Sequence, residues 1–233
     1  MTDRLRFADS GEAADLAAFL GRLVHYDRAA AVRLQAGGGA VAVFGRPPSF
    51  EVLAIRTARL AEPAALDLTV SAGELLESVD ESAGTAVVPA AVTGPPWAGV
   101  LPPRGGWREV PGLPAPEAIR QALAAAVAEF RARDEALPAQ HRTRAERDRI
   151  GREIWSRTLG DTELPLRAVH AAQSLGFLRP IRLTVPAPAP APDAPSPVAL
   201  LASGSWLRLR TPYGSVATRR PGGGLGALQV RPV

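Results

Sequence analysis

The stretch "LPLRAVHAAQSLGFLRPIRL", residues 164–183, decides the fold of the C-terminal half, because a helical pattern in it runs directly into a strand pattern. The helix expected over residues 164–175 either packs on a sheet or serves as the recognition helix of a winged helix-turn-helix. Helix-turn-helix spacing often arises by chance, so the pattern favours the helix-on-sheet interpretation. Four apolar side chains at helical spacing form the predicted buried stripe: Leu166, Val169, Ala172 and Leu175.

The outward face of this predicted helix carries the side chains that DNA recognition needs. Arginine and glutamine can bind the edges of guanine and adenine, serine can contact a phosphate, and alanine permits close approach. This face is therefore a candidate nucleic-acid-binding surface. Its predicted members are Arg167, His170, Ala171 and Ser174, with Gln173 at the edge.

The same helix is preceded by two longer helical patterns and followed by four strand patterns. In "SWLRLR" the period of two places Trp206, Arg208 and Arg210 on one face of a strand. With Arg179 and Arg182 before it, this face is expected to contact phosphates, and binding would then weaken steeply with salt. The expected helices lie at 116–137 and 142–159, and the expected strands at 181–185, 198–202, 206–210 and 215–218.

The N-terminal half alternates strand and helix patterns and predicts a mixed α+β domain with an antiparallel meander. A short strand near residues 5–7 precedes a helix that begins with the capping-box spacing of Asp9 and Glu12. Ser71 and Glu74 repeat this spacing before a second helix. The strands between the helices are expected at 31–36, 40–46, 50–60 and 66–70, separated by Gly37 to Gly39 and by Pro47 and Pro48.

A segment rich in proline and glycine separates the two halves and predicts two domains in an α+β chain. This connector contains Trp97 and Trp107, which either pack the connector against a domain or bind a partner protein; packing is favoured because large aromatic side chains usually serve it first. The expected division is a 1–94 α+β domain, a 95–115 connector, a 116–221 basic domain with a proline-rich loop at 186–197, and a mobile tail at 222–233.

Charge is distributed unevenly between the two halves. All 27 basic residues are arginines, as a GC-rich genome would encode, so arginine enrichment alone is a weak signal. Residues 1–137 contain 13 arginines and 17 acids, a net charge of −4, whereas residues 138–233 contain 14 arginines and 6 acids, a net charge of +8. The C-terminal half is therefore the half expected to meet a polyanion.

The composition excludes several classes of function. The chain has no cysteine, which excludes disulfides, iron–sulfur clusters and cysteine nucleophiles. Its three histidines, His25, His141 and His170, lack metal-ligand spacing, and no glycine-rich segment has the context of a nucleotide-binding loop. The start of the chain lacks a signal-peptide core, and no apolar run approaches the roughly 20 residues that span a bilayer. We therefore expect a cytoplasmic protein with no metal, cofactor, membrane contact or enzymatic activity.

Four segments resemble a family of uncharacterised actinobacterial proteins, and together they cover most of the chain: "VRLQAGGGAVAVFGRPPSFEVLAIRTA", "WAGVLPPRGGW", "LPLRAVHAAQSLGFL" and "WLRLRTPYGSV". This resemblance implies no particular activity. A second resemblance concerns topology, since the order of strand, helix, meander and the helix in "TVSAGELLESV" is similar to one subdomain of a DNA sliding clamp. Such a helix lines the DNA side of a clamp, but here it carries Glu74 and Glu77, and no clamp residue is carried over.

The sequence therefore predicts a non-catalytic, DNA-associated regulatory or structural protein that contacts nucleic acid through its basic C-terminal half. The alternative is a protein-interaction module or an oligomeric scaffold, whose partner is another protein or a second copy of the chain. Steep salt dependence of binding to nucleic acid separates the first prediction from the second.

Overall fold

The computed structural model describes residues 3–95, 97, 99–180 and 197–220, and its helices and antiparallel sheets confirm the α+β fold class. Within these ranges no helix is long and apolar enough to cross a membrane. The expected strand at 181–185, the proline-rich loop up to residue 196 and the tail at 222–233 lie outside the described residues.

The elements of the N-terminal half are β1 (Arg4–Arg6), α1 (Ser10–Tyr26), β2 (Ala31–Gly45), β3 (Leu53–Ser71), α2 (Ala72–Ser78), β4 (Val79–Asp80) and β5 (Thr85–Val87). Those of the C-terminal half are β6 (Arg108–Glu109), α3 (Pro116–Glu135), the short 3-10 helix η1 (Ala139–His141), α4 (Arg144–Trp155), α5 (Leu166–Ser174), β7 (Ala199–Ser203), β8 (Trp206–Thr211) and β9 (Gly214–Arg219).

Side-chain caps determine where the first two helices begin. Asp9 accepts a hydrogen bond from the backbone N–H of Glu12 at 3.0 Å and starts α1. Ser71 accepts one from the backbone N–H of Glu74 at 3.3 Å and starts α2. In each case a side-chain oxygen satisfies a backbone donor that has no partner in the first turn. Both helix starts confirm the prediction from capping-box spacing.

Strands β2 and β3 form one long hairpin in place of the four strands expected from the sequence. Gly37 pairs with Ala65 and Gly38 with Ala64, so glycines that indicate a turn lie inside a continuous ladder. The register then shifts after Gly38, whose φ is +64°. Glycine adopts a positive φ without strain and therefore suits a β-bulge. The prediction of separate strands is wrong because the ladder continues past these glycines: residue 39 of β2 lies opposite residues 60–63 of β3, so the extra residues of the irregularity belong to β3.

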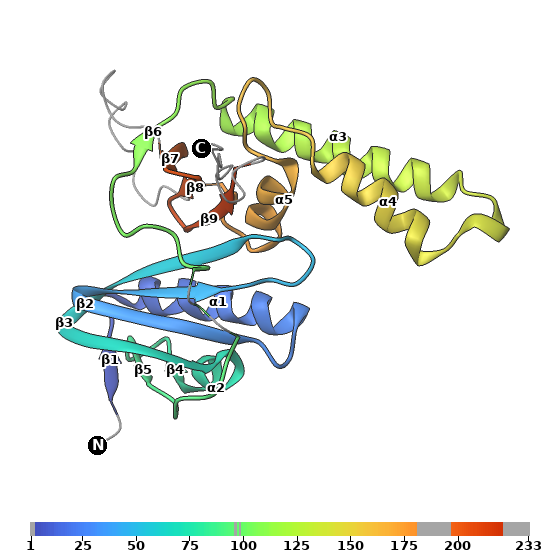
Figure 1. The fold of residues 1–233 in the computed structure, drawn as a ribbon. Coiled ribbons are helices and arrows are strands. Elements are labelled where there is room, and N and C mark those ends of the chain that lie inside the picture. Colours follow the sequence, from blue (N-terminus) through green and yellow to red (C-terminus); the bar gives the residue numbers. More distant parts are fainter. Residues whose placement is uncertain (1–2, 96, 98, 181–196, 221–233) are drawn as a thin grey trace, which may run out of the picture.

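Pairing between β3 and β9 joins both halves of the chain in one six-stranded antiparallel sheet, in the order β2-β3-β9-β8-β7-β6. Leu53 pairs with Ala217, and Ile55 pairs with Ser215. The sheet expected in the C-terminal half is therefore an extension of the N-terminal hairpin, and Figure 1 shows β7, β8 and β9 above β2 and β3. Strands β1, β5 and β4 form a second, three-stranded antiparallel sheet.

Helix α5 packs inside the molecule, as the helix-on-sheet interpretation predicts. It contacts β8 and β9 of the sheet and also contacts α3 and α4. Ala171 is fully buried, so the expectation that it faces outward is wrong, because helices as well as the sheet cover α5. Just after α5, the ring of Phe177 stacks on Phe19 of α1 at 5.5 Å, within one hydrophobic core that includes residues of both halves.

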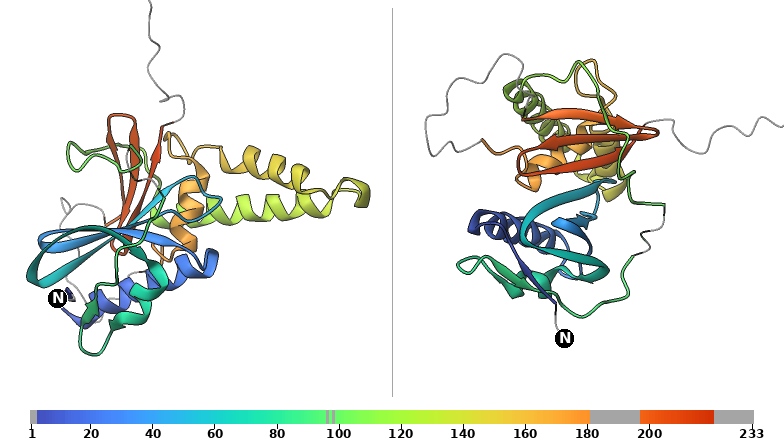
Figure 2. Two further views of the ribbon diagram at one scale, coloured as in Figure 1. Left: turned by 60° about the horizontal axis from the view of Figure 1, so that its bottom comes forward. Right: turned by 90° about the vertical axis from the view of Figure 1, so that its left-hand side faces the viewer.

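Helices α3 and α4 lie side by side as an arm that projects from the rest of the molecule (Figure 1), and the left view of Figure 2 shows the same projection. Arg133 of α3 donates to both carboxylate oxygens of Glu153 of α4, each at 2.7 Å. Arg157 donates to both oxygens of Glu129 at 2.6 and 2.9 Å. Bidentate pairs of this kind have a fixed geometry, so the four side chains hold the two helices in register.

Replacing Glu153 with glutamine should destabilise the protein at neutral pH but much less at low pH. The hydrogen bonds from Arg133, opposed by burial and supported by the charges of Arg133 and Arg157, lower the pKa of Glu153 from 4.5 to about 2. A carboxylate with a depressed pKa stabilises the folded state above its unfolded pKa, and this contribution is lost as the pH falls from 4.5 toward 2. The measurement is the Tm of both proteins across this pH range.

The control for this prediction is Glu135→Gln, because Glu135 lies on the same helix as Arg133 and its carboxylate makes no ion pair with any residue that the structure describes. This variant should have the same Tm as the parent protein at every pH. A Tm difference for Glu153→Gln that stays constant between neutral pH and about pH 3 would show that the network does not set the pKa of Glu153.

Candidate functional site

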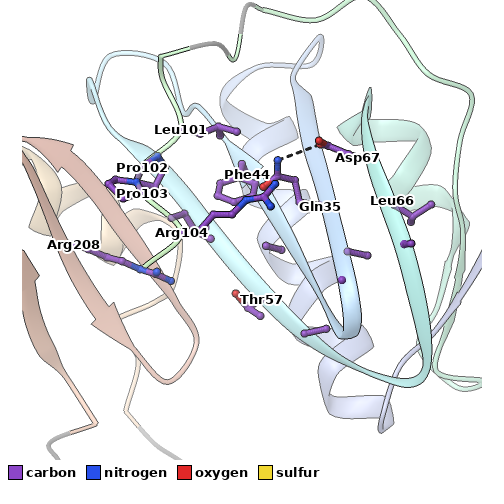
Figure 3. Close-up of a pocket in the computed structure, with 16 residues that line it drawn as sticks. Gln35, Phe44, Thr57, Leu66, Asp67, Leu101, Pro102, Pro103, Arg104 and Arg208 are labelled. Atoms are coloured by element: carbon purple, nitrogen blue, oxygen red, sulfur yellow. Dashed lines mark hydrogen bonds between the residues drawn. The ribbon is translucent and has the colours of Figure 1, made fainter. Parts of the chain in front are cut away.

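A groove crosses the outer face of the six-stranded sheet, on the side away from α1 and α5 (Figure 3). Its volume is about 790 Å³, within the range of ligand-binding pockets. It is called the outer groove below and is lined by residues 35–37, 65–67 and 101–104 and by Ala40, Ala42, Phe44, Ile55, Thr57 and Arg208.

Small side chains on β2 create the hollow. Strand alternation turns Ala40 and Ala42 outward, whereas Val41 and Val43 lie in the main core on the other side of the sheet. Because alanine side chains are short, space remains between the strand and the connector residues 101–104, which form the facing wall.

Strand β8 directs two arginines toward this outer face. Trp206, Arg208 and Arg210 alternate with two buried leucines of the main core, as the period-two pattern predicts. Trp206 is only 7% exposed, and the guanidinium of Arg219 lies 4.3 Å from the centroid of its ring. Trp206 therefore serves packing, and the two arginines of β8 remain as the groups that can meet a ligand.

Arg208 carries a positive charge that no acid among the described residues neutralises. Its Nε donates to Ser215 Oγ at 2.8 Å, and its guanidinium lies 5.7 Å from the centroid of the Trp107 ring. Burial, together with the nearby charge of Arg210, lowers the pKa of Arg208. Within the part of the chain that the structure describes, neither arginine makes an ion pair. An anion in the groove would supply the missing counter-charge, because a partly buried cation is stabilised by pairing.

The opposite end of the groove is already neutralised. Asp67 accepts hydrogen bonds from Arg33 at 2.8 Å and from Gln35 at 3.2 Å, and Figure 3 shows the contact with Gln35. Burial opposes ionisation of Asp67, but these hydrogen bonds outweigh it and lower the pKa of Asp67. The positive charge of Arg104 also lowers this pKa, so Arg104 acts on Asp67, and Arg208 is the cation of the groove that lies away from this carboxylate.

The connector is held on the outer face by a second hydrophobic cluster. Trp97 is 8% exposed and packs there with Phe44 and Ile55. A buried indole offers no surface to another protein, so the interaction candidate Trp97 serves packing. Trp107 is half-buried, and its Nε1 donates to the carbonyl of Pro103 at 3.0 Å, which fixes the wall of the outer groove.

The candidate DNA-reading residues of α5 do not form a free surface. Arg167 is half-buried and lies 3.6 Å from Glu51, and His170 stacks on Trp155 with ring centroids 4.4 Å apart. Burial lowers the pKa of His170. Of the remaining candidates on this helix, Ser174 is half-buried and Gln173 is exposed. A helix covered in this way cannot enter a major groove, which must admit the whole recognition helix.

The other arginine candidates separate into two groups. Arg179 forms an ion pair with Asp15 of α1 and lies over the ring of Tyr213 at 3.7 Å, so its charge is neutralised. Arg182 lies outside the described residues. Arg104 lines the outer groove together with Arg208. The sequence did not indicate Arg104 as a site residue, because the prolines and glycines around it predict only an irregular connector.

Within the described ranges, no group of three or more His, Asp or Glu side chains is placed to hold a metal ion. The polar groups that line the outer groove are two arginines, the carboxylate of Asp67, an amide and a hydroxyl, and they surround an apolar floor. This set suits binding of a ligand with both anionic and apolar parts.

Two family models cover the chain, and the two matches meet in the connector. Residues 1–99 match the model described as Domain of unknown function (DUF8010), and residues 102–223 match the model described as Domain of unknown function (DUF8185). No curated protein and no solved structure matches the chain. The family matches confirm the resemblance to a family of uncharacterised proteins, whereas the actinobacterial source and the sliding-clamp likeness stay predictions.

Proposed function

The chain belongs to the family described as Domain of unknown function (DUF8185), and from that premise we propose that it is a non-catalytic protein that binds single-stranded nucleic acid in the outer groove. The phosphates contact Arg104, Arg208 and Arg210, and the bases lie on the apolar floor. The proposal includes a cytoplasmic location, because nucleic acid is the ligand.

The observation that carries this proposal is the uncompensated charge of Arg208 inside a groove. A half-buried guanidinium without an acid partner is costly unless a ligand pairs with it, and phosphate pairs with guanidinium through two parallel hydrogen bonds. Arg210 stands two residues along the same strand, so the two guanidiniums can follow a run of phosphates.

The shape of the site favours a single strand over a duplex. The buried α5 leaves no helix for a major groove, and a groove of about 790 Å³ on a sheet is too small for a double helix. Proteins that bind single strands combine a basic groove with apolar or aromatic surface on which the bases lie. The half-buried Leu66 and Leu101 in the lining provide apolar surface of this kind, and the half-buried Trp107 lies beside Arg208.

The test is the affinity of the full chain for a fluorescent oligo(dT) of about 15 nucleotides, a length within the usual range of single-strand sites. The double variant Arg208→Gln with Arg210→Gln should bind on the order of tenfold more weakly at about 50 mM salt. The slope of log affinity against log salt should become shallower by about 0.7 for each phosphate that the variant no longer binds. Arg144→Gln with Arg149→Gln on the arm is the matched control, since it removes the same charge elsewhere.

Three results would overturn the proposal. The first is equal binding by the double variant and its control, which would show that net charge alone attracts the oligonucleotide. The second is binding that does not change between about 50 and 200 mM salt, because phosphate contacts are always salt-dependent. The third is tighter binding to a duplex of the same length.

A further inference from the structure

A second pocket lies between α4, α5 and the loop that joins β2 to β3, and it shares no lining residue with the outer groove. Its volume is about 640 Å³, enough for a small organic ligand. It is called the α4–α5 pocket below, and the argument uses its lining residues Phe50, Glu51, Arg152, Trp155, Arg167 and His170. Arg147 and Asp148 also line it, but each forms an ion pair with a residue outside the lining, Asp134 and Arg144 respectively.

Aromatic rings form one side of the α4–α5 pocket. The rings of Trp155 and His170 stack with centroids 4.4 Å apart and an angle of 24° between their planes. The ring of Phe50 meets His170 edge to face at 5.2 Å and 75°. A wall of this kind attracts a flat ring, because offset stacking and edge contacts are the preferred arrangements of aromatic groups.

Arginines with free hydrogen-bond donors form another side. Arg152 is exposed and makes no ion pair within the part of the chain that the structure describes. The Nε of Arg167 is buried and has no hydrogen-bond partner among the described residues, because the nearest carboxylate oxygen, Oε2 of Glu51, is 3.6 Å away. A buried donor without an acceptor is rare in folded proteins, and a bound anion would satisfy it.

The loop beside these groups is held in a strained conformation. Ser49 has a φ of +70° and Glu51 a φ of +53°, values that residues other than glycine seldom adopt. They flank Phe50, so the strained backbone is what presents the Phe50 ring to His170. Strain of this type persists where the surrounding structure enforces it and is concentrated at ligand sites.

From these contacts we infer that the α4–α5 pocket binds a small ligand in which a planar aromatic ring is joined to a phosphate or carboxylate group. The ring lies against Trp155 and His170, and the anionic group accepts hydrogen bonds from Arg152 and Arg167. This inference is independent of nucleic-acid binding, because it uses a different cavity and different residues.

The test uses the full chain and four probes: AMP, indole-3-acetate, adenosine and inorganic phosphate. AMP and indole-3-acetate carry both parts of the proposed ligand, with phosphate and carboxylate respectively, whereas the other two probes carry one part each. Affinities come from calorimetry, and the site is identified from the side-chain NMR signals of the three histidines. Only the His170 signals should shift strongly, because that ring forms the wall.

At least one of AMP and indole-3-acetate should bind at least about tenfold more tightly than adenosine and inorganic phosphate. A tenfold difference is the size expected for one charge-assisted hydrogen bond. Binding of AMP alone identifies phosphate as the anionic group, and binding of indole-3-acetate alone identifies carboxylate. Arg152→Gln should remove about tenfold of this affinity, whereas Arg149→Gln, on the same helix and outside the pocket, should leave it unchanged.

Four outcomes would overturn the inference. If none of the probes binds, the pocket has no such ligand class. If adenosine binds as tightly as the better of AMP and indole-3-acetate, the arginines play no part in binding. If inorganic phosphate binds as tightly as that probe, the aromatic wall plays no part. If binding shifts the signals of His25 or His141 while those of His170 stay in place, the ligand occupies another site.

Discussion

Replacing Gly214 with alanine is expected to lower the free energy of unfolding by about 3 kcal/mol, from a strained backbone and from overpacking together. Gly214 has a φ of +152°, and a Cβ added there would lie 2.5 Å from Cε1 of Phe177. The Phe177 ring is buried and stacks on Phe19, so it cannot move aside without disturbing α1. Urea denaturation of both proteins measures the loss.

Gly204→Ala is the matched control, because Gly204 lies in the turn between β7 and β8 and also has a positive φ, +53°, but has no atom within 4 Å of an added Cβ. The free energy of unfolding of this variant should fall by only about 1 kcal/mol, the cost of placing alanine in this backbone conformation. Equal losses in the two variants would mean that the contact of the added Cβ with Phe177 contributes nothing to the loss of stability.

Replacing Glu12 with glutamine is expected to cost about 3 kcal/mol, since removal of one partner leaves a buried charge poorly compensated. Arg56 is 5% exposed, and its Nη2 lies 2.7 Å from Oε2 of Glu12 and 3.4 Å from Oδ2 of Asp15. Its Nε has no hydrogen-bond partner in the described ranges, so the guanidinium depends on these two carboxylates. The ion pairs join β3 to α1. Urea denaturation again measures the cost.

Glu62→Gln tests whether burial of the ion pair is the cause of the large loss of stability expected for Glu12→Gln. Glu62 also pairs with an arginine, Arg6, at 3.0 Å, but the two side chains are 68% and 61% exposed. Exposed pairs of this kind contribute no more than about 1 kcal/mol, so this variant should unfold at nearly the same urea concentration as the parent protein. A loss as large as that of Glu12→Gln would show that the chemical change, and not its burial, decides the cost.

Local signals predicted the elements whose geometry depends on near neighbours. The spacing of Asp9 to Glu12 and of Ser71 to Glu74 was sufficient to start two helices, because a cap acts within one turn. The alternation in "SWLRLR" likewise gave the correct face for Arg208 and Arg210, because it depends only on the geometry of a single strand.

Long-range features could not be predicted in this way. Gly37 and Gly38 indicate a turn locally, and only their partners Ala65 and Ala64 show that they continue a strand. The pairing of β3 with β9 joins residues that lie far apart in the chain, and no local pattern specifies it. Arg104 belongs to the groove for the same reason, since its place depends on how the connector folds back over β2 and β3.

The central position of β9 in the six-stranded sheet affects how the protein can be made. Residues 53–55 of β3 leave the ribosome long before residues 215–217, their partners in β9. Until β9 arrives, that edge of β3 has unpaired backbone donors and acceptors, which another strand can occupy. A nascent or truncated chain is therefore exposed to aggregation through this edge, and completion of synthesis, not emergence of the N-terminal half, protects it.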